Sequence, residues 1–288
     1  MLEIRRILFP VDFSERCTAA ASHVAAMARQ FHAKVTLLHV IRTPRVWRGD
    51  LASEGLEALI EMPQLINERQ VRLNTYLRNE FEDVADIERI VSQGEPARVI
   101  TEHVRNERSH LVMMPTHGYG PFRRMLLGSI TAKVLHDAEC PVWTDVHDEI
   151  SFARLGCQSV ICAVDLREEM VSAIQWAAAY AASCRAALTL MHAIPAIAGP
   201  ARPSEIRFRS YLMESARDYI ADLQRQAGTS AEVCIQGGRI APAVRTIALQ
   251  SAAELVVIGQ GCIHETLGRL RSNAYAIIRE SPCPVVRV

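Results

Sequence analysis

The sequence predicts an α/β protein built from two tandem doubly wound parallel-sheet domains, and three observations support this prediction. The chain has 288 residues, about twice the common size of a single domain. Short apolar runs alternate with segments of helical periodicity, which is typical of βαβ units in a parallel sheet covered on both faces. The two halves also repeat each other, so we place one domain in residues 1–147 and the other in residues 157–288.

The internal repeat is visible at five places that occur in the same order in both halves. The matching pairs are ILFPVDFSE (7–15) with VICAVDLRE (160–168), AKVTLLHVI (33–41) with AALTLMHAI (186–194), GEPARVI (94–100) with GRIAPAV (238–244), LVMMP (111–115) with LVVIG (255–259), and ECPVWT (139–144) with PCPVVRV (282–288). Five matches in one order indicate the duplication of a unit of about 145 residues. The polar segment 145–156, which has no apolar periodicity, separates the two copies.

The elements of each half can be justified in order. Residues 4–12 form an apolar run fit for a buried strand, and Ser14 with Glu15 is the expected N-cap of an alanine-rich helix that runs to about residue 31. The pattern then predicts a strand at 35–41, a helix at about 55–83, a strand at 87–92, a helix at 96–107, a strand at 110–115, a helix from Ser129 to about 138 and a strand at 141–145, with the long helix of the second half at 204–226. In such a sheet, ligands bind at the carboxyl ends of the strands, near the switch in strand order.

Composition and charge disfavour several classes of protein. Lys plus Arg and Asp plus Glu both total 32, so no basic excess is available to hold a nucleic acid. No apolar stretch approaches the ~18 residues needed to span a membrane, and the N-terminus lacks a signal-peptide pattern, so we expect a cytoplasmic protein. The eight cysteines are scattered without zinc-ligand spacing, and we expect reduced, buried thiols and no metal site.

Two loops at the expected ligand edge carry residues suited to binding. Asp12 and Asp165 each follow the first strand of their half, where a carboxylate either caps the turn or accepts from a ligand amine. Gly118 can bring backbone N–H groups close to an anion. The pair Gly128–Ser129 opens a helix, so it offers unpaired N–H donors, a hydroxyl and the positive end of the helix dipole.

Three segments together resemble the universal stress protein family: PVDFSE near the N-terminus, LLHV at the end of the second strand, and THGYGPFRRMLLGSITAKVLHDAECPV. The resemblance covers both halves of the chain. It implies a Rossmann-like fold of the adenine nucleotide alpha hydrolase type, with the two domains packed as an internal pseudo-dimer through their last strands. It also implies ATP or another adenine nucleotide as ligand, with or without Mg²⁺.

The resemblance assigns roles to residues of the first half. Asp12 and Val40 would hold adenine, and Pro10 would lie near the ribose. The phosphates would be lined by Met114, Pro115, Thr116, His117, Gly118, Gly128, Ser129 and Ile130. One departure concerns Pro115, which stands where the family has a glycine and which has no N–H to donate to a phosphate.

The second half departs further from the family pattern. Cys262 stands where the second glycine is expected, and no glycine precedes the following helix. Ala193 and Ala163 occupy the positions of Val40 and Pro10. We therefore predict a second site that keeps Asp165 but lacks a working phosphate grip.

The leading functional hypothesis is a non-enzymatic stress-response protein that binds an adenine nucleotide and an unidentified protein partner. The chain has no catalytic motif of the GxSxG or GxxxxGK[ST] type and no GxGxxG after the first strand. For His39 and His192, at the ends of matching strands, we expect a hydrogen bond to a neighbouring loop. Two alternatives stay open: a nucleotide-free interaction module, and a slow ATPase that uses His117 and Ser129. A homodimer of whole chains also stays open.

Overall fold

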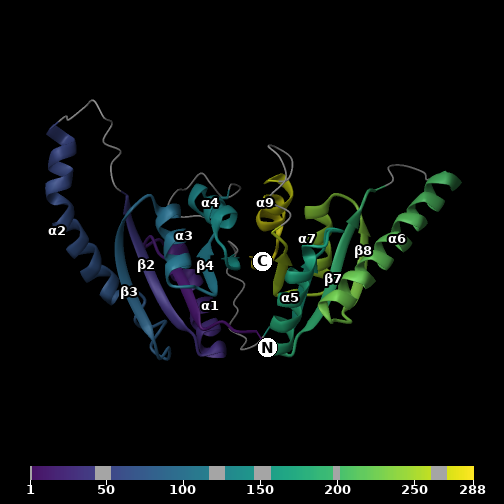
Figure 1. Cartoon of the computed structure of the whole chain (residues 1–288), viewed down its shortest axis with the longest axis horizontal. Coiled ribbons are helices and arrows are strands. Elements are labelled where there is room, and N and C mark those ends of the chain that lie inside the picture. Colours follow the sequence, from purple (N-terminus) through teal and green to yellow (C-terminus); the bar gives the residue numbers. More distant parts are fainter. Residues whose placement is uncertain (1, 43–52, 117–126, 146–156, 197–201, 261–270) are drawn as a thin grey trace. The chain divides into compact units, whose positions relative to one another are not determined.

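The computed structural model describes residues 2–42, 53–116, 127–145, 157–196, 202–260 and 271–288. These residues divide into two compact units, Glu3–Val142 and Trp143–Val288, the second of which also includes Leu2. The division falls inside strand β5. Each unit is an α/β fold with a parallel sheet, which confirms the predicted fold class (Figure 1).

The elements of the first half alternate as the sequence predicts. In chain order they are β1 (Arg6–Pro10), α1 (Glu15–Phe31), β2 (Lys34–Arg42), α2 (Ser53–Thr75), β3 (Ile87–Gly94), α3 (Pro96–Asn106), β4 (Leu111–Pro115), α4 (Ser129–Asp137) and β5 (Val142–Asp145). One boundary was predicted wrongly, because α2 ends at Thr75 and not near residue 83. Leu77 adopts a left-handed backbone with φ of 56°, and residues 76–83 form turns.

The second half repeats this order. Its elements are β6 (Ser159–Ala163), α5 (Met170–Cys184), β7 (Ala187–Ile194), α6 (Pro203–Ala227), β8 (Glu232–Gly237), α7 (Ile240–Gln250), β9 (Leu255–Ile258), α9 (Arg271–Glu280) and β10 (Val285–Arg287). The ends of matching helices agree as well. Both α1 and α5 stop at a residue in the left-handed conformation, His32 and Arg185, whose N–H groups donate to carbonyls of the last turn.

The strand order creates a switch point in each unit. In the first unit the order is β3-β2-β1-β4, with parallel pairing of β1 to both β2 and β4. The chain moves from β1 outward to β3 and then crosses back to place β4 on the other side of β1. The second unit has the matching order β9-β6-β7-β8. Ligands of such sheets bind where this reversal occurs, at the carboxyl ends of the two strands beside the switch.

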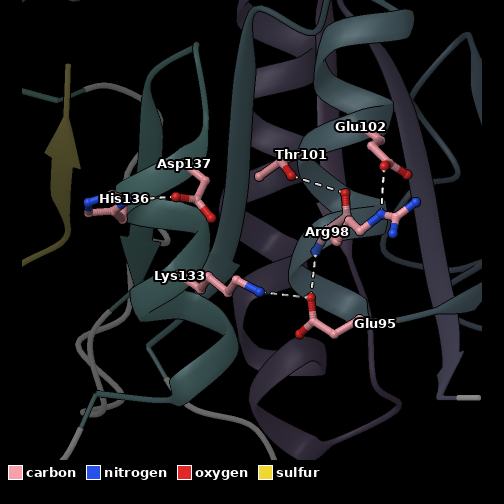
Figure 2. A network of polar contacts seen from close by, with 7 residues as sticks. All are labelled: Glu95, Arg98, Thr101, Glu102, Lys133, His136 and Asp137. Carbon is pink, nitrogen blue, oxygen red and sulfur yellow. Dashed lines mark hydrogen bonds and ion pairs between the residues drawn. The ribbon is translucent and has the colours of Figure 1, made fainter. Parts of the chain in front are cut away.

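Helices cover the strands of the first unit and bury its apolar core. Helix α1 packs on β1 and β4, α3 packs on β2 and β3, and α3 and α4 lie side by side (Figures 1 and 2). Apart from the exposed Arg6 at the start of β1, the residues of the central strands β1 and β4 are apolar and buried, as expected for strands covered on both faces. Within the part of the chain that the structure describes, we find no helix that is both long enough and apolar enough to cross a bilayer.

Candidate functional site

A cavity of about 420 Å³ opens at the switch point of the first unit, between the carboxyl ends of β1 and β4. Its lining comes from the ends of three strands, the loop after β1 and the N-terminal parts of three helices: Pro10, Val11, Asp12, Cys17, Leu38, His39, Val40, Arg42, Pro96, Ile100, Met114, Pro115, Gly128, Ser129, Ile130 and Thr131. Ligand pockets for small molecules commonly measure about 300 to 1,000 Å³. The cavity therefore has room for a small organic ligand.

The structure brings most of the predicted site residues to this one cavity. Those that line it are Pro10, Asp12, Val40, Met114, Pro115, Gly128, Ser129 and Ile130. Thr116 is buried, with 3% of its surface exposed, and does not line the cavity, although its carbonyl accepts a hydrogen bond from the N–H of Gly128 at 2.9 Å. His117 and Gly118 lie outside the described residues.

Asp12 is held in a fixed orientation at the edge of the cavity. Its Oδ1 atom accepts hydrogen bonds from the N–H of Ser14 at 3.0 Å and from the thiol of Cys17 at 3.1 Å. Among the residues that the structure describes, none donates to Oδ2. One oxygen thus fixes the carboxylate, while the other keeps its capacity to accept a hydrogen bond.

Cys17 stays a neutral thiol because of where it lies. Burial and the negative charge of Asp12 raise its pKa to about 12. At neutral pH the S–H group is therefore available to donate to Asp12, and the sulfur is a poor nucleophile. From the sequence Cys17 is expected only to be one of the buried cysteines; its position three residues after the N-cap Ser14 is the signal that places it beside Asp12.

His39 supports the same loop from the neighbouring strand. Its Nδ1 atom lies 2.8 Å from the carbonyl oxygen of Val11, which requires that Nδ1 carries a proton and donates. The ring also packs against Phe13 with ring centroids 4.4 Å apart. Burial lowers the pKa of His39, so the ring is neutral at neutral pH. His192 makes the same 2.8 Å contact with the carbonyl of Val164, and both confirm the predicted hydrogen bond to a neighbouring loop.

The N-terminus of α4 presents unpaired amide groups to the cavity. No side chain caps this helix, and within the described part of the chain the N–H groups of Ser129 and Ile130 have no acceptor. The hydroxyl of Thr131 donates to the carbonyl of Pro115 at 3.2 Å and ties the end of β4 to the first turn of α4. Free N–H groups and the helix dipole both favour an anion at this position.

A polar network joins α3 to α4 beside the cavity (Figure 2). Glu95 caps α3 by accepting from the N–H of Arg98 at 2.9 Å, and Lys133 reaches from α4 to the same carboxylate at 3.2 Å. Partial burial acts to raise the pKa of Glu95, but the Arg98 N–H group and the Lys133 ammonium outweigh it and lower the pKa. Because Pro96 and Ile100 of α3 line the cavity, this network fixes two of its borders relative to each other.

Sequence reasoning missed several residues that line the cavity, chiefly Cys17, Arg42, Pro96, Ile100 and Thr131. Arg42 lies two residues beyond Val40 on β2, so strand alternation places both on one face. The helix residues Ile100 and Thr131 carry no motif. Only the packing of α3 against α4 brings them to the site.

The corresponding edge of the second unit has different chemistry. Asp165 lies 3.8 Å from the guanidinium of Arg167, a residue that stands where the first unit has Ser14. The side chain of Met170, at the position of Cys17, is buried with 1% of its surface exposed. The loop with Cys262, which lacks the expected glycine, falls in residues 261–270, outside the described part of the chain.

Comparison with known proteins gives one consistent result. The model of the universal stress protein family matches residues 3–145 and again residues 157–288. Two universal stress proteins of Methanocaldococcus jannaschii are each 28% identical to this chain, one over 149 residues (48% of this chain, 79% of the relative) and the other over 151 residues (48% and 92%). The crystal structure of a universal stress protein from Archaeoglobus fulgidus superposes with a TM-score of 0.65 at 19% identity, covering 99% of this chain and 96% of that one. The chain therefore belongs to the universal stress protein family and carries two of its domains in tandem.

Proposed function

We propose that the first unit binds an adenine nucleotide in the cavity between β1 and β4, and that the protein acts by binding and not by catalysis. The observation that carries the proposal is the meeting of two kinds of group in one cavity. Asp12 offers a carboxylate to a base at one side, and the start of α4 offers free amide groups to phosphates at another. We place the protein in the cytoplasm, where its thiols stay reduced.

The base would be held by Asp12 and Val40. Oδ2 of Asp12 would accept from the exocyclic amine of adenine, while the half-buried Val40 packs on the ring. An amine donor is required because an ionised carboxylate only accepts hydrogen bonds. This arrangement favours adenine over guanine, which presents a carbonyl at the corresponding position.

The phosphates would lie at the start of α4, next to Gly128, Ser129 and Ile130, with His117 and Gly118 contributing from the loop before them. Pro115 would weaken the binding of the outermost phosphate, because it lacks the N–H donor that a glycine would supply. Mg²⁺ would then accompany a triphosphate through the phosphate oxygens and water. The described residues contain no group of three or more His, Cys, Asp or Glu side chains that could hold a metal ion alone.

The protein would act through a partner protein whose affinity depends on the bound nucleotide. A nucleotide shifts such an equilibrium only by the difference in its affinity for the free and partner-bound forms. The second unit would serve as a scaffold without a nucleotide of its own. The internal ion pair of Asp165 with Arg167 supports this division of roles.

The test replaces Gly128 by Glu and by Ala and measures ATP, ADP and AMP binding by isothermal titration calorimetry. Gly128 has φ −59° and ψ 140°, a conformation open to any residue, so neither change strains the backbone. A carboxylate at the start of α4 suits the helix dipole but repels phosphate. We expect about one nucleotide per chain for the wild type and for Gly128→Ala, and loss of binding for Gly128→Glu without a loss of thermal stability.

The rival is a nucleotide-free interaction module, which the proline at position 115 favours because it removes a phosphate donor. Wild-type protein that binds none of the three nucleotides would support the rival. Equal binding by the wild type and Gly128→Glu would show that the nucleotide lies elsewhere.

A further inference from the structure

Phe13, which lies between Asp12 and Ser14, has an unusual backbone conformation. Its φ of 63° falls in the left-handed region, where the Cβ atom of any residue but glycine is crowded by the following carbonyl oxygen. The side chain is buried, with 7% of its surface exposed. A strained backbone of this kind persists only where the surrounding structure holds it in place, and such residues cluster at functional sites.

Three side chains hold the ring of Phe13. The ring centroid of His39, on β2, lies 4.4 Å away, and the ring of Tyr76 meets it edge-on at 5.0 Å. The guanidinium of Arg72, in the last turn of α2, lies 4.2 Å above the ring centroid. The hydroxyl of Tyr76 also donates to the carbonyl of Ser14 at 3.3 Å. Aromatic and cation–π contacts stabilise a buried ring beyond the effect of its burial, so they offset the strain in the backbone.

The left-handed backbone of Phe13 directs the next N–H group to the side chain of Asp12. This N–H belongs to Ser14 and donates to Oδ1 of Asp12 at 3.0 Å. The hydroxyl of Ser14 in turn accepts from the N–H of Cys17 at 3.3 Å, which caps α1. One change in backbone direction therefore starts the helix and also fixes the Asp12 carboxylate at the edge of the cavity.

The matching loop of the second unit lacks this conformation. Leu166 stands at the position of Phe13, does not adopt the left-handed backbone and is only partly buried. The N–H of Arg167 donates to the main-chain carbonyl of Asp165 at 2.8 Å, in the manner of a γ-turn. Helix α5 begins later in the repeat than α1 does, at Met170. The equivalent aspartates thus follow different backbone paths.

We propose that Phe13 is a positioning residue of the base site. Its ring, held by the three side chains described above, keeps the backbone left-handed, and this backbone sets the Asp12 carboxylate where it meets the base. The proposal rests on the proposed function and deepens it, because it gives the end of α2 a part in base recognition. Without the aromatic contacts the loop would relax toward the path that it takes in the second unit.

The experiment compares two substitutions of Phe13. Phe13→Leu introduces the residue of the second unit, whereas Phe13→Gly removes the ring but adopts the left-handed conformation without steric crowding. We expect AMP binding, measured by calorimetry, to be about tenfold weaker in Phe13→Leu and within about threefold of the wild type in Phe13→Gly. Thermal stability should fall more in Phe13→Gly, because it leaves the larger cavity. A side chain that only stabilised the fold would give the same order of variants in both measurements.

A matched control separates loss of stability from loss of position. Phe81 is another buried ring of the first unit, which lies against Phe9 with centroids 6.4 Å apart and does not line the cavity. Phe81→Leu removes the same atoms, and AMP affinity should stay within about twofold of the wild type. Equal AMP affinity in Phe13→Leu and the wild type, or weaker binding by Phe13→Gly than by Phe13→Leu, would overturn the proposal.

The conformation of the loop can also be measured without a ligand. Hydrogen exchange of the Ser14 amide, followed by NMR, reports on its bond to Asp12 and should be faster in Phe13→Leu than in the wild type and in Phe81→Leu. If the wild type binds no adenine nucleotide, the proposed function fails, and this exchange alone decides the role of Phe13. It also decides if Phe13→Gly does not fold. Unchanged exchange in Phe13→Leu would overturn the proposal in either case.

Discussion

Removal of the Glu95 carboxylate should destabilise the first unit through the loss of a helix cap. In Glu95→Ala the N–H of Arg98 loses its acceptor, and loss of an N-cap side chain costs about 1 kcal/mol, within a range of about 0.5–2. The ion pair with Lys133 adds at most about 0.5 kcal/mol because both side chains are about half exposed. The expected loss in the free energy of unfolding is about 1–1.5 kcal/mol, which at a urea dependence of about 2 kcal/mol per molar moves the midpoint by about 0.6 M.

Matched variants separate the cap from the ion pair. Lys133→Met removes only the ion pair and should cost at most about 0.5 kcal/mol. Glu102→Ala removes the exposed pair with Arg98 on the same helix and should cost about 0.3–0.5 kcal/mol. Urea unfolding followed by circular dichroism measures all three. A loss in Glu95→Ala no larger than that in Lys133→Met would refute the capping role.

The contribution of Glu95 to the free energy of unfolding should depend on pH in a defined direction. The pKa of Glu95 is lowered from its ordinary value of 4.5, so the unfolded chain takes up the proton first as the pH falls. Its contribution to stability is complete above pH 4.5 and is lost as the pH falls through the lower folded value. The difference between the wild type and Glu95→Ala should therefore shrink below pH 4.5.

Three further predictions concern the loop around Asp12. Asp12→Asn should weaken adenine nucleotide binding about 10- to 100-fold, since a hydrogen bond to a charged group contributes about 1.5–3 kcal/mol; calorimetry measures this, and an unchanged affinity would place the base elsewhere. The thiol of Cys17, with a pKa of about 12, should resist Ellman's reagent at about pH 8 in the native protein and react with it in urea. Peptide mass spectrometry measures the labelling of this residue, and equally fast labelling in both conditions would contradict its burial beside Asp12. The pKa of His39 lies below its ordinary value of 6.5, so the unfolded chain binds the proton first, and the free energy of unfolding should fall as the pH drops from 6.5 through the folded value. The stability of His39→Gln should depend less on pH over that range. An identical stability profile would exclude His39 as the titrating group.

The order of elements could be predicted because local signals mark almost every boundary. Ser14 and the alanine-rich run set α1, and the internal repeat allows each half to support the other. The end of α2 was predicted wrongly because the apolar pattern continues past Thr75, while the buried Leu77 adopts a left-handed backbone that no glycine or proline announces in the sequence. The internal pseudo-dimer and the residue limits of the two domains stay predictions.

The candidate site could be predicted where a motif or a strand end marks it, as for Asp12 and Gly128. Residues that reach the cavity from helix faces could not be predicted. The periodicity of α3 predicts which face of the helix is buried, but it does not predict that this face lies beside a cavity. The contact of Met170 with Gly259 was also beyond the sequence. A glycine at position 259 looks like a retained family residue until the neighbouring side chain is seen to need the space.

The central claim is that the first unit, and it alone, holds an adenine nucleotide. The most direct measurement denatures freshly purified protein and identifies the released nucleotides by chromatography and mass spectrometry, for the wild type and Gly128→Glu in parallel. We predict about one adenine nucleotide per chain from the wild type and none from the variant. Release of no nucleotide, followed by no binding of added ATP, ADP or AMP, would contradict the claim and favour the interaction module.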